Sequence, residues 1–175
     1  GLRPPLVSSE QQIGFLNALI QEMAGRVGIT VEILILPAER VLVNVNNGIE
    51  DGCVLRIKGL EERYPNMVRV EEVRMYSEFV GYHNLEKGPE GGLWANLDPY
   101  QVVYITGWKI FDINLEQHPH IVKVNNAEQL FQMLQSNRTD ISLYERWQGL
   151  GILNEMGVEN VNVIEPPFVR LDMYM

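Results

Sequence analysis

Short apolar runs rich in Val and Ile recur along the second half of the chain, about one βα unit apart. They cover residues 102–105, 121–124, 141–144 and 161–164. Helix-like stretches separate them, one of them capped by Asn125 or Asn126 and carrying Leu130, Phe131 and Leu134. Strands that alternate with short helices predict a mainly parallel sheet covered by helices on both faces. In such sheets ligands bind beyond the carboxyl ends of the strands, so function is expected there.

The first half of the chain mixes both periodicities. Ser8 and Ser9 are N-cap candidates for an amphipathic helix that Gly28 ends. Pro37 opens a second helix, at a position that tolerates proline. The predicted elements are a helix over 13–27, a strand over 30–36, a helix over 37–48, a strand over 51–57, a half-exposed strand over 67–75 and extended chain over 77–83.

A break in the pattern suggests two lobes. Residues 84–92 have no periodicity and are rich in turn formers. The predicted division is a first lobe over 1–82, a second over 83–168 and a segment over 169–175 that starts back toward the first lobe. Two small α/β lobes with a cleft between them would bury apolar surface, and such a cleft is a default ligand site.

Composition narrows the class of protein. The 175 residues are 46% hydrophobic and carry a net charge of -9 without a Lys/Arg cluster, which argues against a nucleic-acid partner. The single cysteine, Cys53, lies in an apolar run and is expected to be a buried, inert thiol. No apolar run approaches transmembrane length. Gly1 is not an initiator Met, so the lack of a signal peptide carries no conclusion.

The order of these segments resembles a known family. Pro4-Pro5-Leu6 precedes a helix that begins near Gly14-Phe15, and residues 37–40 open a helix that ends in the turn-rich 47–52. A strand ending at Gly107 and a helix, turn and Asp over 126–140 follow. This arrangement is similar to the periplasmic solute-binding proteins of amino-acid ABC transporters. The resemblance implies an α/β fold of type II topology, with two lobes that close on a ligand.

The resemblance also implies two charged ligand contacts. An arginine of the first lobe holds the ligand carboxylate in that family, and Arg56 is the candidate here, with Arg63 behind it; a guanidinium binds a carboxylate with two parallel hydrogen bonds. The alternative for Arg56 is a surface ion pair with Glu61 or Glu62. An acidic residue binds the ligand ammonium, which implies Glu145. The alternative for Glu145 is a first-turn residue favoured by the helix dipole.

Other positions complete the expected site. Thr106, Gly107 and Trp108 form the strand-to-helix turn that contacts ligand in the family, where backbone N–H groups suit an anion. Ordinary packing is the alternative for Trp108. Pro4, Pro5 and Leu6 would line the first-lobe wall, and Tyr76 and Tyr82 flank the expected crossover between lobes. Weaker candidates are Arg40, Arg138 and Tyr144.

No catalytic or metal motif is present. His118 and His120 lie close together but have no third ligand at zinc-site spacing. No nucleophile elbow, phosphate loop or dinucleotide glycine pattern occurs, so neither catalytic residues nor a cofactor are expected.

The sequence thus predicts a monomeric periplasmic protein that captures a small polar, amino-acid-like solute for the membrane subunits of an ABC transporter. A ligand-sensing domain of a signalling protein, an enzyme on this fold and a family member without a small ligand stay open as alternatives.

Overall fold

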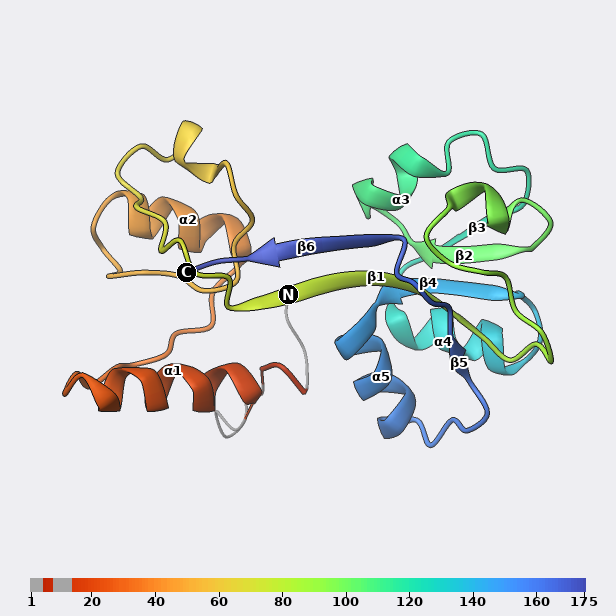
Figure 1. Ribbon diagram of the computed structural model, residues 1–175, viewed down its shortest axis with the longest axis horizontal. Coiled ribbons are helices and arrows are strands. Elements are labelled where there is room, and N and C mark those ends of the chain that lie inside the picture. Colours follow the sequence, from red (N-terminus) through yellow and green to blue (C-terminus); the bar gives the residue numbers. More distant parts are fainter. Residues whose placement is uncertain (1–4, 8–13) are drawn as a thin grey trace. The chain divides into compact units, whose positions relative to one another are not determined.

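The computed structural model describes residues 5–7 and 14–175 and divides the chain into two compact units (Figure 1). Unit 1 comprises residues 1–77 and 171–175, and unit 2 comprises residues 78–170. The chain therefore crosses between the units at 77/78 and again at 170/171, a few residues from the lobe limits predicted from the sequence.

One mixed sheet supplies most of the regular structure. Its six strands lie in the order β3-β2-β4-β1-β5, and β6 pairs with β1. The bounds are β1 Met75–His83, β2 Val102–Ile105, β3 Ile121–Val124, β4 Ile141–Glu145, β5 Asn162–Val163 and β6 Val169–Met173. Strand β2 runs parallel to β3 and β4, whereas β1 runs antiparallel to β4 and β5. All four apolar runs of the second half form strands, but the last one pairs antiparallel with β1 instead of extending the parallel set.

Helices cover both faces of the sheet in unit 2, as the sequence predicts. The helices are α3 (Lys109–Asn114), α4 (Ala127–Gln135) and α5 (Arg146–Glu155), with a 3-10 turn over Trp94–Leu97. Val103 and Tyr144 pack with α4 and α5, while their chain neighbours Val102 and Leu143 pack with α3 on the opposite face. Figure 1 shows α4 and α5 on one side of the strands and α3 on the other. Because both faces of these short strands are buried, their residues are mostly apolar, and such apolar runs identify the strands in the sequence.

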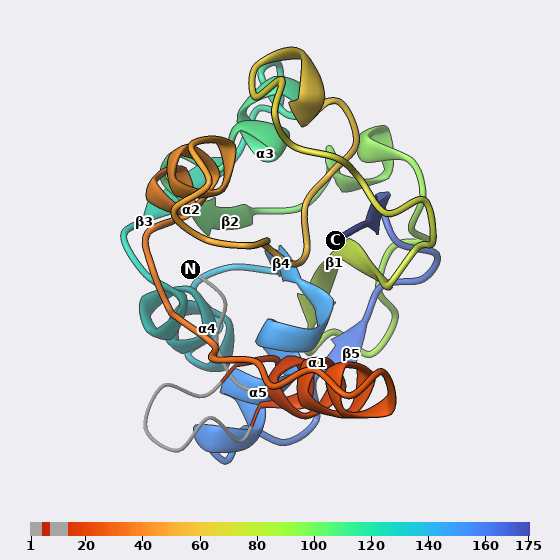
Figure 2. The same ribbon diagram turned by 90° about the vertical axis from the view of Figure 1, so that its left-hand side faces the viewer.

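Unit 1 contains two longer helices and irregular chain. The elements are α1 (Phe15–Arg26), α2 (Ala38–Asn46) and a 3-10 turn over Leu60–Glu62. Figure 2, in which α1 and α2 face the viewer, shows them joined by an extended connection. The two predicted helices are confirmed, and Gly28 and Gly48 follow their ends with positive φ angles of 72° and 68°. Ser8, Ser9 and Ile13 lie outside the described residues, as does Pro4.

The strands predicted in unit 1 are wrong except for the one that becomes β1. Residues 30–36 form no strand, residues 51–57 form only a bridge between Arg56 and Tyr174, and 67–74 are irregular. Leu34 and Ile35 are 50% and 53% exposed. Because successive side chains of a strand point to opposite sides, exposure of both leaves part of each face open to solvent. The segment has the composition of a strand but is not part of any strand in the described structure.

Candidate ligand-binding residues

The carboxyl ends of the parallel strands bring two predicted site residues together. Val102 pairs with Ile141 and Val103 with Ser142 in the parallel β2–β4 ladder. Thr106 directly follows β2 and Glu145 is the last residue of β4, so both lie at the carboxyl ends of these parallel strands. This edge is where ligands bind in sheets of this type.

Glu145 is a buried carboxylate with an unused oxygen. It is 3% exposed and caps α5, its Oε2 accepting the backbone N–H of Gln148 at 2.9 Å. Its Oε1 is also buried and has no hydrogen-bond partner among the described residues. Burial raises the pKa of this carboxyl, and the backbone N–H of Gln148 opposes that shift. The helix-capping alternative therefore accounts for one oxygen of Glu145, whereas the other receives no hydrogen bond from the described residues.

The turn after β2 presents one exposed face and one packed face. Thr106 is exposed, but both its backbone N–H and its hydroxyl donate to the carbonyl of Val124, at 2.9 and 3.1 Å. Gly107 is exposed, with φ of +84° and open space where a Cβ would stand. Trp108 stacks on Phe111 with ring centroids 5.6 Å apart and contacts Tyr144 at 4.8 Å. The packing alternative thus describes the Trp108 ring, and its contact with ligand stays a prediction.

A close contact between Tyr82 and Gly149 holds the start of α5. The buried Tyr82 hydroxyl donates to the carbonyl of Arg146 at 2.6 Å and to that of Glu145 at 3.2 Å. A Cβ on Gly149 would stand 2.3 Å from that hydroxyl. The lack of a side chain at Gly149 thus makes room for the Tyr82 ring. Burial raises the pKa of Tyr82, so the hydroxyl stays protonated as a donor.

In unit 1, Leu6 belongs to a small core and Pro5 to a helix start. Leu6 packs with Leu16 and Leu55 and is 5% exposed. The carbonyls of Pro5 and Leu6 accept the backbone N–H groups of Phe15 and Leu16, each at 3.0 Å. These bonds satisfy two N–H groups that a helix start leaves free. Pro5 is exposed and Leu6 buried, so only Pro5 presents a side chain to solvent.

Arg56 has no salt bridge to any described residue. Its backbone exchanges two hydrogen bonds with Tyr174, of 2.9 and 2.8 Å, and its Nε is buried without a hydrogen-bond partner among the described residues. The residue before it, Leu55, is held in the left-handed region at φ 55°, which costs about 1 kcal/mol for a residue with a Cβ. This strained backbone precedes a guanidinium that no described carboxylate neutralises.

Neither acidic residue proposed as an ion-pair partner of Arg56 binds it. Glu61 binds Arg69 at 2.8 Å, and Arg63 binds Glu39 at 2.8 Å in an exposed pair. Glu62 forms no salt bridge with a described residue. The surface-pair alternative for Arg56 is therefore not what the structure shows.

The remaining candidates contribute less to a site. Tyr76 is 41% exposed on β1, and Arg40 is exposed on α2. The Nε2 atom of His118 lies 2.9 Å from the carbonyl of Leu97, and its Nδ1 accepts the backbone N–H of His120. Among the described residues, no group of three or more His, Cys, Asp or Glu side chains could hold a metal ion.

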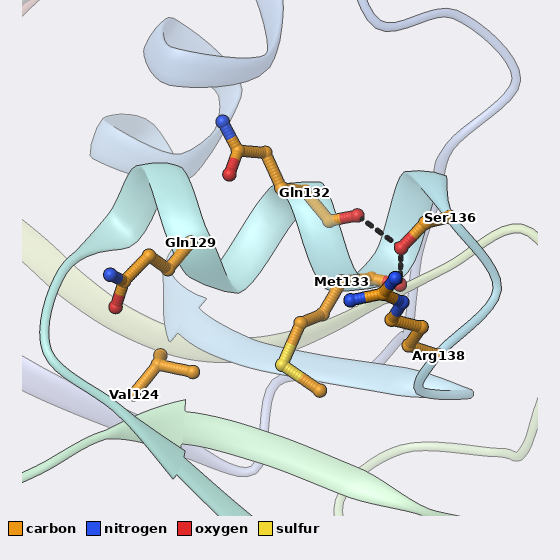
Figure 3. A pocket seen from close by; sticks show the side chains of 6 residues that line it. All are labelled: Val124, Gln129, Gln132, Met133, Ser136 and Arg138. Atoms are coloured by element: carbon orange, nitrogen blue, oxygen red, sulfur yellow. Dashed lines mark hydrogen bonds between the residues drawn. The ribbon is translucent and has the colours of Figure 1, made fainter.

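A shallow hollow of about 260 Å³ lies between β3 and α4 (Figure 3). In Figure 3, Met133 and Val124 face each other across it, and Arg138 lies beside Ser136, whose hydroxyl donates to the carbonyls of Gln132 and Met133. Ligand pockets usually measure roughly 300–1,000 Å³. The hollow is lined by Arg138, a weaker candidate, and by none of the other residues predicted to bind ligand.

Solved structures share the fold of this chain. The putative binding component of an ABC transporter from Wolinella succinogenes, complexed with lysine, is 14% identical; the match covers 96% of this chain and 74% of that one, with a TM-score of 0.67. An ancestral arginine-binding protein bound to arginine is 16% identical, with 97% and 80% covered and a TM-score of 0.60. The arginine-bound form of truncated ArgBP from T. maritima is 15% identical, with 98% and 81% covered and a TM-score of 0.59.

These matches establish the fold predicted from the sequence, that of the type II periplasmic binding proteins. No protein-family model matches the chain, and no characterised protein matches it by sequence. Within the described part of the chain, no helix is both long and apolar enough to cross a membrane.

Proposed function

We propose that this chain is a solute-binding protein that captures a small amino-acid-like ligand. The observation that carries the proposal is the buried Oε1 of Glu145, at the carboxyl end of the parallel strands, which has no hydrogen-bond partner among the described residues. An unpaired buried carboxylate is costly, and a cationic ligand group would offset that cost. The fold supports the same conclusion, since structures that share it are described as bound to arginine, lysine or glutamine.

Each charged end of an amino acid has a matching residue under this proposal. Glu145 in unit 2 accepts the ligand ammonium, and Arg56 in unit 1 binds the ligand carboxylate with its planar fork of donors. Thr106, Gly107 and Trp108 contact the ligand from unit 2, and Pro5 and Tyr76 from unit 1, whereas the Leu6 side chain is buried against Leu16 and Leu55 and takes no part. Ligand capture shifts the protein to its ligand-bound conformation, and charge complementarity and desolvation supply the affinity.

The wider role follows from the same proposal. The protein acts as a monomer in the periplasm and hands its ligand to the membrane subunits of an ABC transporter. It makes and breaks no bond, and it needs neither a metal nor a cofactor. Its net charge of -9 is compatible with a freely diffusing carrier.

Isothermal titration of the full chain with the twenty amino acids tests the proposal. We expect saturable one-to-one binding of at least one amino acid. Glu145→Gln keeps an oxygen for the Gln148 N–H but removes the charge, and should weaken that binding by roughly 100-fold, as expected when one partner of a buried charge pair is removed. Glu155→Gln, on the exposed end of the same helix, is the matched control and should bind like the wild type. Binding by no amino acid would overturn the proposal.

A further inference from the structure

Arg146 is the centre of an ion network that the sequence does not reveal. Its Nε donates to Glu78 Oε2 at 2.6 Å, and its two Nη atoms donate to both carboxylate oxygens of Glu165 at 2.6 and 2.8 Å. Arg170 reaches the other oxygen of Glu78 at 3.9 Å. The Arg146 and Glu78 side chains are 13% and 16% exposed, so this pair is largely removed from water.

Two members of this network lie at the crossings of the chain, and Glu165 lies in the segment that leads to the second crossing. Glu78, on β1, is the first residue of unit 2, and Arg170, on β6, is its last. Glu165 lies between β5 and β6. Arg146 therefore joins the two segments through which unit 2 connects to unit 1, using contacts that all lie within unit 2.

The position of Arg146 on its helix makes these partners necessary. It is the first residue of α5, where the helix dipole disfavours a cation by roughly 0.3–1 kcal/mol. Two carboxylates around one guanidinium outweigh that term, and they raise the pKa of Arg146 while its hydrogen bonds lower the pKa of Glu165. An arginine at the first position of α5 gains no stabilisation from the helix dipole. The carboxylates of Glu78 and Glu165 account for its position instead.

Arg146 is also fixed to the proposed ligand contact. It directly follows Glu145, and the Tyr82 hydroxyl binds the carbonyls of both residues. A displacement of the crossing segments that pulls on Arg146 therefore acts on the peptide unit that carries the Glu145 carboxylate.

We propose that Arg146 is a positioning residue that links Glu145 to both chain crossings, so that ligand capture and the conformation of the crossings are coupled. The ligand half of this inference rests on the proposed function. Arg146 itself touches no ligand: its guanidinium is occupied by Glu78 and Glu165, and it acts through the segments that it holds.

Hydrogen exchange of the ligand-free full chain tests the link without any ligand. In Arg146→Gln we expect amide exchange roughly tenfold faster in both crossing segments, residues 78–83 and 165–170, because removal of one partner leaves buried carboxylate unpaired. Arg146→Lys keeps the charge but loses the bidentate fork, and its exchange rates should lie between those of the wild type and Arg146→Gln. Arg138→Gln, an exposed arginine of the same unit without a salt bridge to a described residue, is the matched control and should match the wild type. Faster exchange confined to α5 would overturn the proposal.

Titration with L-arginine tests the coupling. We expect Arg146→Gln to bind roughly tenfold more weakly than the wild type through faster dissociation, with stoichiometry unchanged, and Arg146→Lys to recover part of the loss. Should Arg146→Gln fail to fold, the same comparison is made with Glu165→Gln, which removes only the bidentate partner. Affinity and dissociation rate within twofold of the wild type would refute the coupling. If the wild type binds neither L-arginine nor any other amino acid, the proposed function and the coupling fall together, whereas the exchange measurement still decides whether Arg146 joins the crossings.

Discussion

Replacing Gly149 with Ala should destabilise unit 2, although alanine is the better helix former. The new Cβ would stand 2.3 Å from the Tyr82 hydroxyl and 2.5 Å from the ring carbon that bears it. Tyr82 is fully buried between the sheet and α4–α5, with its ring against Phe131 at 5.2 Å, so it has little room to move.

The magnitude follows from three opposing terms. Overpacking a filled core costs about 1–3 kcal/mol. Displacing the Tyr82 hydroxyl from the Arg146 carbonyl costs about another 1 kcal/mol, and the helix propensity of Ala returns about 1 kcal/mol. The expected loss is therefore about 1–3 kcal/mol in free energy of unfolding, and about 2 kcal/mol lowers the Tm of a chain of this size by roughly 4–8 °C.

Tryptophan fluorescence is a suitable assay because all three tryptophans, Trp94, Trp108 and Trp147, lie in unit 2. The matched control is Gly25→Ala in α1, where a Cβ meets nothing within 4 Å, so the change should raise stability by up to about 1 kcal/mol when followed by far-UV circular dichroism. The reasoning is refuted if Gly149→Ala stabilises unit 2 as Gly25→Ala stabilises unit 1.

Two further predictions concern the charged residues. The pKa of Glu145 is raised in the folded protein, so the native state holds more protons than the unfolded state, and stability decreases as pH rises from near the ordinary value of 4.5 through the folded pKa. Glu145→Gln should therefore stabilise the ligand-free protein at neutral pH and lose this advantage below pH 4.5. Urea unfolding across that pH range measures the effect, and a stabilisation independent of pH would contradict the sign of the pKa shift. Arg56→Gln should weaken binding of the amino acid that binds most tightly by roughly 100-fold. It should not lower the unfolding midpoint, because Arg56 has no salt bridge to a described residue. Arg40→Gln is the exposed control, and equal affinities of the two variants would show that Arg56 does not contact the ligand.

The sequence predicts unit 2 better than unit 1 for a physical reason. Strands β2 and β4 are buried on both faces, so their composition alone marks them, and Asn126 is confirmed as a cap because its side chain accepts the N–H of Gln129 at 2.8 Å. The segment over 30–36 has the same composition but forms no strand. Composition reports what a strand can bury, whereas pairing depends on segments remote in the chain.

The candidate site shows the same limit. Glu145 could be selected because it ends a recognisable strand, but its unpaired oxygen is a property of the packed structure. Arg146 was missed altogether, since its partners lie 68 and 19 residues away along the chain and no local spacing joins them. Likewise, glycine is unfavourable inside a helix, and only the position of the Tyr82 ring explains why Gly149 stands in α5.

The central claim is that the free oxygen of Glu145 recognises the ammonium group of an amino acid. Calorimetric titration of the wild type, Glu145→Gln and Glu155→Gln with L-arginine and with its analogue lacking the α-ammonium group tests it most directly. The account predicts that the wild type and Glu155→Gln bind L-arginine much more tightly than the analogue, and that Glu145→Gln binds both weakly and alike. If Glu145→Gln still prefers L-arginine as strongly as the wild type does, Glu145 does not bind the ammonium and the account is contradicted.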